Sequence, residues 1–136
     1  MTVFVDTSAL YAAIVGTEEH HSRVLDTYRE LLESGRPIHT TNYIVVETAA
    51  LLQHRVGLEA VHDFDGRILP VLQIHWVTED LHRKAMRWLL RENQRQASLV
   101  DCVSFEFMTA EGLRDAFALD RHFATAGFRL LPGSPH

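Results

Sequence analysis

The feature that most constrains this chain is a short apolar run, Val3–Val5, that stops abruptly at Asp6 and two hydroxyl residues. An apolar run without polar alternation is typical of a strand buried on both faces of a sheet. The segment that follows favours a helix, so Asp6 is expected where a central parallel strand passes into a helix. In open α/β sheets, ligand sites form at this carboxyl edge. The simpler alternative is that Asp6, Thr7 or Ser8 only caps the helix.

Size and composition fit one ordinary globular domain. The 136 residues, 46% hydrophobic and 23% charged, predict a domain over residues 1–131 and a frayed tail over 132–136. No apolar run reaches the roughly 18 residues of a membrane span, and no secretory leader precedes the first strand. The single Cys102 cannot form an internal disulfide, so we expect a cytoplasmic protein. The net charge of −5 argues against nucleic-acid binding by bulk positive charge, so a polyanionic substrate would require a metal ion and local arginines.

Strand and helix patterns alternate along the chain, which predicts an α/β fold with a mainly parallel sheet wrapped by helices. The expected strands cover residues 3–5, 38–40, 71–77, 116–119 and 128–130. The expected helices cover residues 9–14, 18–33, 42–55, 58–69, 79–93, 98–108 and 121–126.

A second acid, Glu47, lies within the expected helix over residues 42–55. At 100° per residue it shares a face with Ile44, Thr48 and Leu51, and this face is expected to pack inward. An unpaired charge is costly there, so the carboxylate requires a partner, an ion or a raised pKa. A structural salt bridge to a buried arginine is the alternative interpretation.

A third acid, Asp101, follows Ser98 at the spacing of a capping box, with Asp in place of the usual Glu. The same placement suits a metal ligand near a helix N-terminus. Ser104, one turn further along, shares the face of Asp101 and is expected to hold its carboxylate. The pattern therefore allows both a cap and a ligand.

The fourth acid, Asp120, repeats the arrangement of Asp6, because an apolar strand delivers an aspartate at its carboxyl end. A plain helix cap is again the alternative. Asp115 lies five residues upstream. At about 3.3 Å per residue, Asp115 belongs to the opposite edge of the sheet, so we exclude it from the site.

Four carboxylates at one edge require a counter-charge. Two carboxylates about 4 Å apart repel by roughly 4 kcal/mol at an effective dielectric near 20. Four together would cancel a large part of a domain's roughly 5–15 kcal/mol of stability. Oxygen ligands from carboxylates and water favour Mg²⁺ or Mn²⁺ over zinc. A cation held in this way activates water and shields a phosphodiester oxyanion, so the pattern predicts metal-assisted phosphodiester hydrolysis.

Taken together, four segments resemble the motifs of PIN-domain nucleases, in particular the VapC-type ribonuclease toxins of type II toxin–antitoxin systems. The segments are residues 3–10, 41–47, 98–105 and 119–128, and they follow the order of the family across nearly the whole chain. The resemblance implies a three-layer α/β/α sandwich and an endoribonuclease that depends on Mg²⁺ or Mn²⁺. It also implies a homodimer and a cognate antitoxin whose tail covers the site. It does not imply which RNA is cut.

The resemblance also assigns roles to individual residues. It makes Asp6 and Asp101 direct metal ligands. Glu47 and Asp120 complete the acidic pocket by contacting the metal through water or by orienting the nucleophile. The hydroxyl positions that support the pocket are Thr7 or Ser8, and Ser104.

Other features are interpreted more simply. The basic stripe of the expected helix over residues 79–93 is a solvated face, with a phosphate track or an acidic partner as the alternative. It consists of Arg83, Lys84, Arg87, Arg91 and Arg95. By their position just after Asp120, Arg121 and His122 are expected to contact substrate, and the alternative is that they only cap and pack. The nine histidines lack cysteine partners at metal spacing and do not predict zinc, and Cys102 is assigned to the core. A stripe of Tyr28, Leu31 and Leu32 is either core or a groove for a dimer partner or antitoxin.

Other classes with acids at strand ends fit less well. A phosphoacceptor receiver domain requires a lysine on a late strand, but the only lysine, Lys84, lies in an expected helix. A phosphatase of the haloacid dehalogenase type requires Asp-x-Asp after the first strand, and this chain has Ser8 at the second position. The remaining alternative is a non-catalytic PIN fold that binds RNA or a protein partner without cutting.

Overall fold

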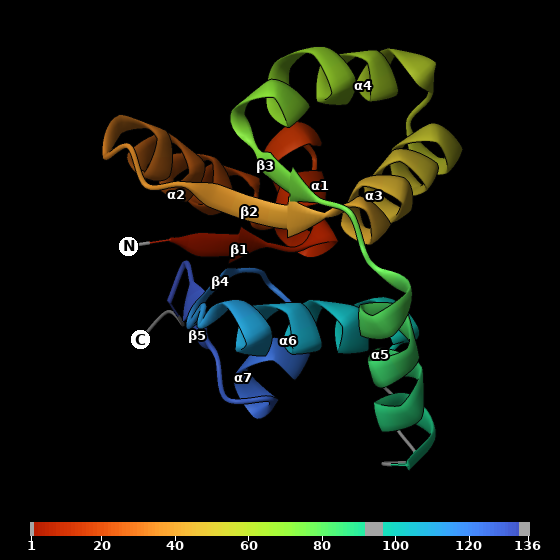
Figure 1. Cartoon of the computed structure of the whole chain (residues 1–136). Coiled ribbons are helices and arrows are strands. Elements are labelled where there is room, and N and C mark those ends of the chain that lie inside the picture. The colour runs from red at the N-terminus through yellow and green to blue at the C-terminus, as the bar shows by residue number, and fades with distance from the viewer. Residues whose placement is uncertain (1, 92–96, 134–136) are drawn as a thin grey trace.

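A parallel sheet forms the centre of the protein. The computed structural model describes residues 2–91 and 97–133. Its sheet has five strands in the order β3-β2-β1-β4-β5, and each of these pairings is parallel (Figure 1). The strands are β1 (Val3–Val5), β2 (Ile38–Thr41), β3 (Gln73–His75), β4 (Asp115–Phe117) and β5 (Arg129–Leu131). The predicted parallel sheet is therefore confirmed.

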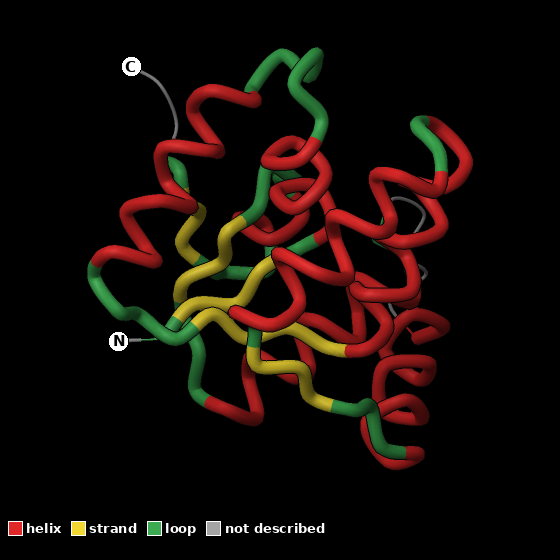
Figure 2. Tube along the Cα trace, turned by 90° about the horizontal axis from the view of Figure 1, so that it is seen from above, coloured by secondary structure: helices red, strands yellow, loops and turns green. Residues whose placement is uncertain are grey.

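Helices cover both faces of this sheet. They are α1 (Thr7–Ile14), α2 (His21–Glu33), α3 (Asn42–Arg55), α4 (Leu58–Asp63), α5 (Glu79–Arg91), α6 (Leu99–Glu111) and α7 (His122–Thr125). On one face, the β1 residue Phe4 contacts Phe107 of α6 and Phe123 of α7, with ring centroids 5.9 and 6.2 Å away. Helices α1, α2 and α3 cover the other face (Figures 1 and 2). This arrangement confirms the predicted three-layer sandwich.

The register of the sheet decides which residues share an edge. Val5 of β1 lies opposite Phe117 of β4, so the chain leaves both strands at the same carboxyl edge. Asp115 lies at the other end, opposite Val3. All three residues of β1 are fully buried, because neighbouring strands flank it and helices cover both of its faces. This burial explains the apolar run without alternation.

The segment between α4 and β3 differs from the predicted single helix over residues 58–69. The α-helix ends at Asp63 and continues as a π turn, η1 (Phe64–Ile68), and a 3-10 turn, η2 (Leu69–Val71). Pro70 explains the change, because in an α-helix its ring would clash with the carbonyl of Gly66. Strand β3 therefore begins at Gln73 and not at Val71.

Other differences are shifts at element ends. Helix α2 begins at His21 and not at residue 18, and β4 ends at Phe117 and not at residue 119. The predicted end of α5 at residue 93, Arg95 of the basic stripe, and residues 134–136 of the tail lie outside the described residues.

The α2 stripe is mainly part of the core. Tyr28 and Leu31 are buried, whereas Leu32 is 42% exposed. None of the described helices combines the length and apolar character required to cross a membrane.

Candidate active site

Asp6 leaves the carboxyl end of β1 and caps α1. Its Oδ2 accepts hydrogen bonds from the backbone nitrogen of Ser8 at 3.1 Å and from the Ser8 hydroxyl at 2.7 Å. Asp6 is only 4% exposed, and this burial raises its pKa from 3.8 to about 7. The bonds from Ser8 lower the pKa, whereas the charges of Asp101 and Glu47 raise it further. The same carboxylate therefore serves as a helix cap and as part of a group of acids.

Glu47 reaches the same edge from α3. Burial raises its pKa, a hydrogen bond from Thr7 lowers it, and the charges of Asp101 and Asp120 raise it. The Thr7 hydroxyl in turn accepts a hydrogen bond from Thr48 at 3.0 Å. The groups that perturb the Glu47 pKa thus include two acids and no arginine. This result favours the site interpretation of Glu47 over a structural salt bridge.

Asp101 lies in the first turn of α6, where Ser98 forms a complete capping box with it. The Asp101 nitrogen donates to the Ser98 hydroxyl at 3.1 Å, and the Ser98 nitrogen donates to Asp101 Oδ2 at 3.0 Å. Burial raises the Asp101 pKa, and the charge of Asp120 adds to this effect. The bonds from Ser98 and the charge of His122 oppose it. Like Asp6, Asp101 therefore both caps a helix and interacts with the other acids.

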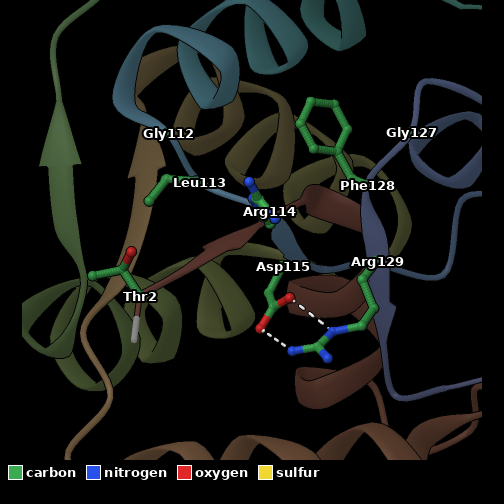
Figure 3. Close-up of a pocket in the computed structure, with 8 residues that line it drawn as sticks. All are labelled: Thr2, Gly112, Leu113, Arg114, Asp115, Gly127, Phe128 and Arg129. Atoms are coloured by element: carbon green, nitrogen blue, oxygen red, sulfur yellow. Dashed lines mark hydrogen bonds and ion pairs between the residues drawn. The ribbon is translucent and has the colours of Figure 1, made fainter.

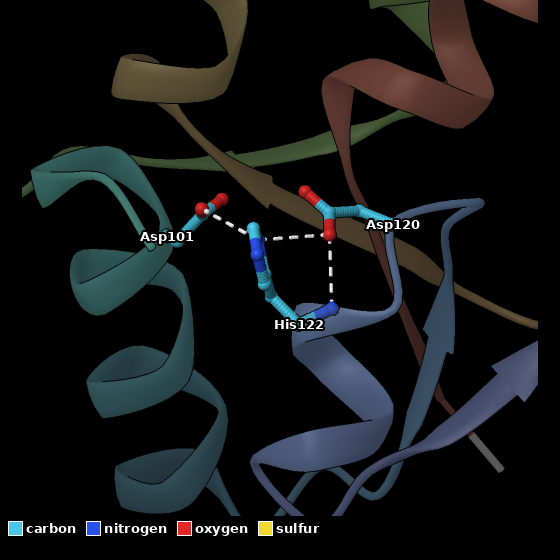
Figure 4. Close-up of side chains that lie close together, drawn as sticks. All are labelled: Asp101, Asp120 and His122. Carbon is cyan, nitrogen blue, oxygen red and sulfur yellow. Dashed lines mark hydrogen bonds and ion pairs between the residues drawn. The ribbon is translucent and has the colours of Figure 1, made fainter. Parts of the chain in front are cut away.

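Asp120 and His122 complete the group from the start of α7. Asp120 Oδ1 accepts a hydrogen bond from the backbone nitrogen of His122 at 2.9 Å. The His122 ring lies between two carboxylates, with Nδ1 2.9 Å from Asp120 Oδ1 and 3.5 Å from Asp101 Oδ2 (Figure 4). Ligand atoms of Asp101, Asp120 and His122 all lie within 4.8 Å of one another.

The four acids that the sequence singled out lie close enough together for their charges to add to burial in raising the pKa values of three of them, and we call the four the acidic cluster (Asp6, Glu47, Asp101 and Asp120). Among them, only Asp101 and Asp120 belong to the group of ligand atoms within 4.8 Å of one another. Ser8 joins two of its segments, because its hydroxyl donates to Asp6 and accepts from the Leu119 nitrogen at 2.9 Å. This bond ties the β1–α1 turn to the chain that follows β4.

The structure also places the two remaining predicted residues, Ser104 and Arg121. The Ser104 hydroxyl donates to the Val100 carbonyl oxygen at 3.1 Å, within its own helix. A hydroxyl has one proton, so Ser104 does not hold the Asp101 carboxylate as predicted. Arg121 is exposed directly beside Asp120.

The sequence left His122 open between a substrate contact and a capping or packing role, and the structure places its ring beside Asp101 and Asp120. The sequence offered a signal, because His122 follows Asp120 by two positions at the start of a short helix. Its first turn directs the ring back towards the acids.

The donor set fits a divalent cation. The four carboxyl groups of the cluster offer oxygen atoms, which are the ligands that Mg²⁺ and Mn²⁺ prefer. Three of its carboxyl groups have raised pKa values, caused by burial and by one another's charge. A bound cation would relieve this unfavourable charge, and Asp6 and Asp101 are the most deeply buried of the four acids.

Asp115 lies apart from this cluster, as predicted. Its carboxylate accepts hydrogen bonds from Arg129 Nε, Arg129 Nη2 and Arg36 Nη2, each at 2.8 Å. The Arg129 and Arg36 guanidiniums lower its pKa. It borders a hollow of about 760 Å³ at the amino edge of the sheet, together with Thr2, Arg114, Phe128 and other residues (Figure 3). This hollow at the amino edge is therefore separate from the acidic cluster.

A parallel sheet with acids converging at its carboxyl edge is the arrangement of the PIN-domain class. The chain belongs to the PIN-domain family, whose sequence pattern matches residues 3–129. It is 36% identical over 128 residues to VapC20, a 23S rRNA-specific endonuclease of Mycobacterium tuberculosis, with 93% of this chain and 95% of VapC20 covered.

Solved structures agree with this assignment. The crystal structure of Mycobacterium tuberculosis VapC20, a Sarcin-Ricin loop cleaving toxin, matches with a TM-score of 0.81 and 34% identity over 93% of this chain and 96% of that one. FitAcB from Neisseria gonorrhoeae matches with a TM-score of 0.70 at 14% identity, over 95% of this chain and 96% of its own. DNA-bound VapBC from Salmonella typhimurium matches with a TM-score of 0.67 at 14% identity, over 96% of both chains. The last two share the fold.

Proposed function

We propose that this protein is a metal-dependent endoribonuclease that hydrolyses RNA phosphodiester bonds and acts as the toxin of a toxin–antitoxin pair. The single observation that carries this function is the convergence of four acids from separate segments at the carboxyl edge of the sheet. Similarity to VapC20, an RNA-cleaving endonuclease, supports RNA as the substrate class.

In this proposal, Asp6 and Asp101 hold Mg²⁺ or Mn²⁺. Such an ion, when bound, lowers the pKa of water and shields the charge that develops on the phosphate. The Ser8 and Ser98 groups fix the orientation of the two ligand carboxylates through their hydrogen bonds.

Glu47 and Asp120 act beside these ligands. The raised pKa of Glu47 suits a group that accepts a proton from the attacking water, and its bond with Thr7 fixes its position. Asp120, whose Oδ1 lies 2.9 Å from the His122 ring nitrogen Nδ1, contacts the metal through water or orients the nucleophile. Arg121, exposed next to Asp120, is in position to contact the substrate phosphate.

The partners follow from the same assignment. We propose a cytoplasmic homodimer formed by the domain over residues 1–131, whose acidic site is covered by a cognate antitoxin. Similarity of the fold to VapBC and FitAcB is compatible with such a partner. The exposed side chains Arg83, Lys84 and Arg87 of α5 stay assigned to a solvated face, since Arg83 already pairs with Glu79 at 3.6 Å.

The test is RNA cleavage by the purified protein with Mg²⁺ or Mn²⁺, with and without EDTA. We expect cleavage with either ion and none with EDTA. Asp6→Asn and Asp101→Asn should lower the rate by at least about 100-fold, since each removes a ligand charge. Asp65→Asn, which changes an exposed acid outside the cluster, is the matched control and should cut normally.

Circular dichroism should show that the two inactive variants are folded. Sequencing of RNA ends after brief expression would identify the target. Cleavage that persists in EDTA would contradict the metal mechanism, and binding of RNA without any cleavage would assign the chain to the non-catalytic alternative.

A further inference from the structure

A small hollow lies beside the acidic cluster, between α5, α6 and α7. Its volume is about 120 Å³, and its walls include Trp88, Ala97, Phe105, His122 and Ala126. Sites that bury a whole drug-sized ligand measure roughly 300–1,000 Å³. The hollow therefore suits one flat ring, not a whole nucleotide or a folded peptide.

The aromatic wall of this hollow is held in place. Phe105 is 4% exposed, and its ring packs against Phe123 and Phe128 with centroids 4.9 and 5.8 Å away. Trp88 meets the Phe105 ring edge-on at 5.5 Å and 62°. Trp88 is only partly buried, so it combines a fixed backing with an accessible face. Such a surface is suited to stacking against a ring.

His122 connects the hollow to the acidic cluster. Its side chain lines the hollow, while its Nδ1 lies 2.9 Å from Asp120 and 3.5 Å from Asp101. The two sites are thus separated by the width of one imidazole ring. An RNA whose scissile phosphate lies at the acids would thus have its adjoining nucleotides next to His122, which lines the same hollow as Trp88.

We infer that the hollow beside Trp88 and His122 receives the base of a nucleotide adjoining the scissile phosphate and helps to select the cleavage site. This inference rests on the ribonuclease function proposed above. Stacking on an aromatic ring is available to every base and requires no positive charge. A chain with a net charge of −5 gains little affinity for RNA from bulk electrostatics, so stacking of a base would supply affinity that charge does not.

The first test uses short RNAs that span the mapped cut site and carry one abasic nucleotide at successive positions. In the wild-type protein, the abasic change at one position adjoining the cut should lower kcat/KM by roughly 5- to 100-fold. Trp88→Leu removes the stacking face, and Ala126→Phe fills the hollow from its exposed rim without removing core. Both variants should cut intact RNA more slowly and lose most of the abasic penalty. Trp76→Ala removes an exposed tryptophan outside the hollow, and this variant should show the same abasic penalty as the wild-type protein.

The second test measures binding without cleavage. Trp88 is the only tryptophan left in Trp76→Phe. Combined with Asp6→Asn, this variant should show fluorescence quenching by intact RNA and less quenching by the RNA that is abasic at the sensitive position. Anisotropy of a fluorescein-labelled RNA should confirm that both RNAs are bound in this measurement.

The outcomes separate the two proposals. Absence of RNA cleavage by the wild-type protein with Mg²⁺ and Mn²⁺ would overturn both. Cleavage with the same abasic penalty in Trp88→Leu, Ala126→Phe and wild type would overturn only the base site. Loss of antitoxin binding in Trp88→Leu, with cleavage and penalties unchanged, would assign the hollow to a protein side chain and also overturn it.

Discussion

At the scale of single residues, Asp6 combines two roles that oppose each other. As a cap it stabilises α1 through its bonds with Ser8. As a buried acid it resists ionisation, and its pKa rises from 3.8 to about 7. A site that concentrates negative charge for a cation thus lowers the stability of the protein without the cation.

This conflict predicts a more stable Asp6→Asn variant in EDTA. Below pH 3.8 Asp6 is protonated in both states and has no effect. Between pH 3.8 and about 7 the unfolded chain releases the proton while the folded chain retains it, so wild-type stability falls as pH rises. The full shift corresponds to roughly 4 kcal/mol as an upper bound.

Asparagine removes the charge and still caps the helix. We expect Asp6→Asn to gain about 1–3 kcal/mol at pH 8 and little at pH 4. Urea unfolding between pH 4 and 8 measures this difference. An identical pH dependence in the two proteins would contradict it.

At the scale of elements, Asp115 joins β4, β5 and the chain entering β2. Asp115 is 4% exposed, and its carboxylate is shared by Arg129 of β5 and by Arg36, which precedes β2. These partners lower its pKa, so its stabilising effect is present above pH 3.8 and is lost as pH falls through the lowered pKa. The amino edge of the sheet is therefore stabilised by ion pairs of Asp115 with Arg36 and Arg129. At the carboxyl edge, burial and the charges within the acidic cluster raise the pKa values of three of its acids.

Asp115→Asn should destabilise the fold without reaching the site. Removing one partner of a buried ion pair costs about 3–5 kcal/mol. Because Arg129 is 64% exposed here, we expect a smaller loss of about 1–3 kcal/mol at pH 7. The loss should disappear in strong acid, where the wild-type carboxyl is also protonated. Urea unfolding measures the stability, and RNA cleavage at 25 °C should stay near the wild-type rate. A cleavage defect larger than the loss of folded protein would contradict the separation of the two edges.

Element boundaries also show where the sequence was informative. Asp6 and Asp120 were predictable, because each follows an apolar run that leads out of a strand, and parallel strands share a carboxyl edge. The π turn before β3 was not, because hydrophobic spacing alone does not register the clash that Pro70 creates with Gly66. The sequence places His122 two positions after Asp120, but the direction of its ring depends on the angle at which a short helix leaves Asp120, which the spacing alone does not give.

At the scale of the whole molecule, binding of a cation should couple to protons and to folding. Burial raises the pKa of Asp6 to about 7, so below that pH the folded protein retains a proton that a cation must displace. The raised pKa values of Glu47 and Asp101 act in the same direction. The affinity for the cation should therefore rise with pH. A ligand that binds only the folded state at 100 times its Kd adds about 2.7 kcal/mol to the stability.

We therefore expect Mn²⁺ to raise the melting temperature of the wild-type protein more at pH 8 than at pH 6, by several degrees. Thermal unfolding at matched ionic strength measures this effect, with Ca²⁺-free EDTA buffer as the reference. Asp101→Asn should lose most of the increase because it lacks one ligand, while Asp115→Asn, which changes an acid at the other edge of the sheet, should retain it. An increase that is equal at both pH values would mean that the cation binds without displacing protons, and one that survives in Asp101→Asn would place the cation elsewhere on the protein.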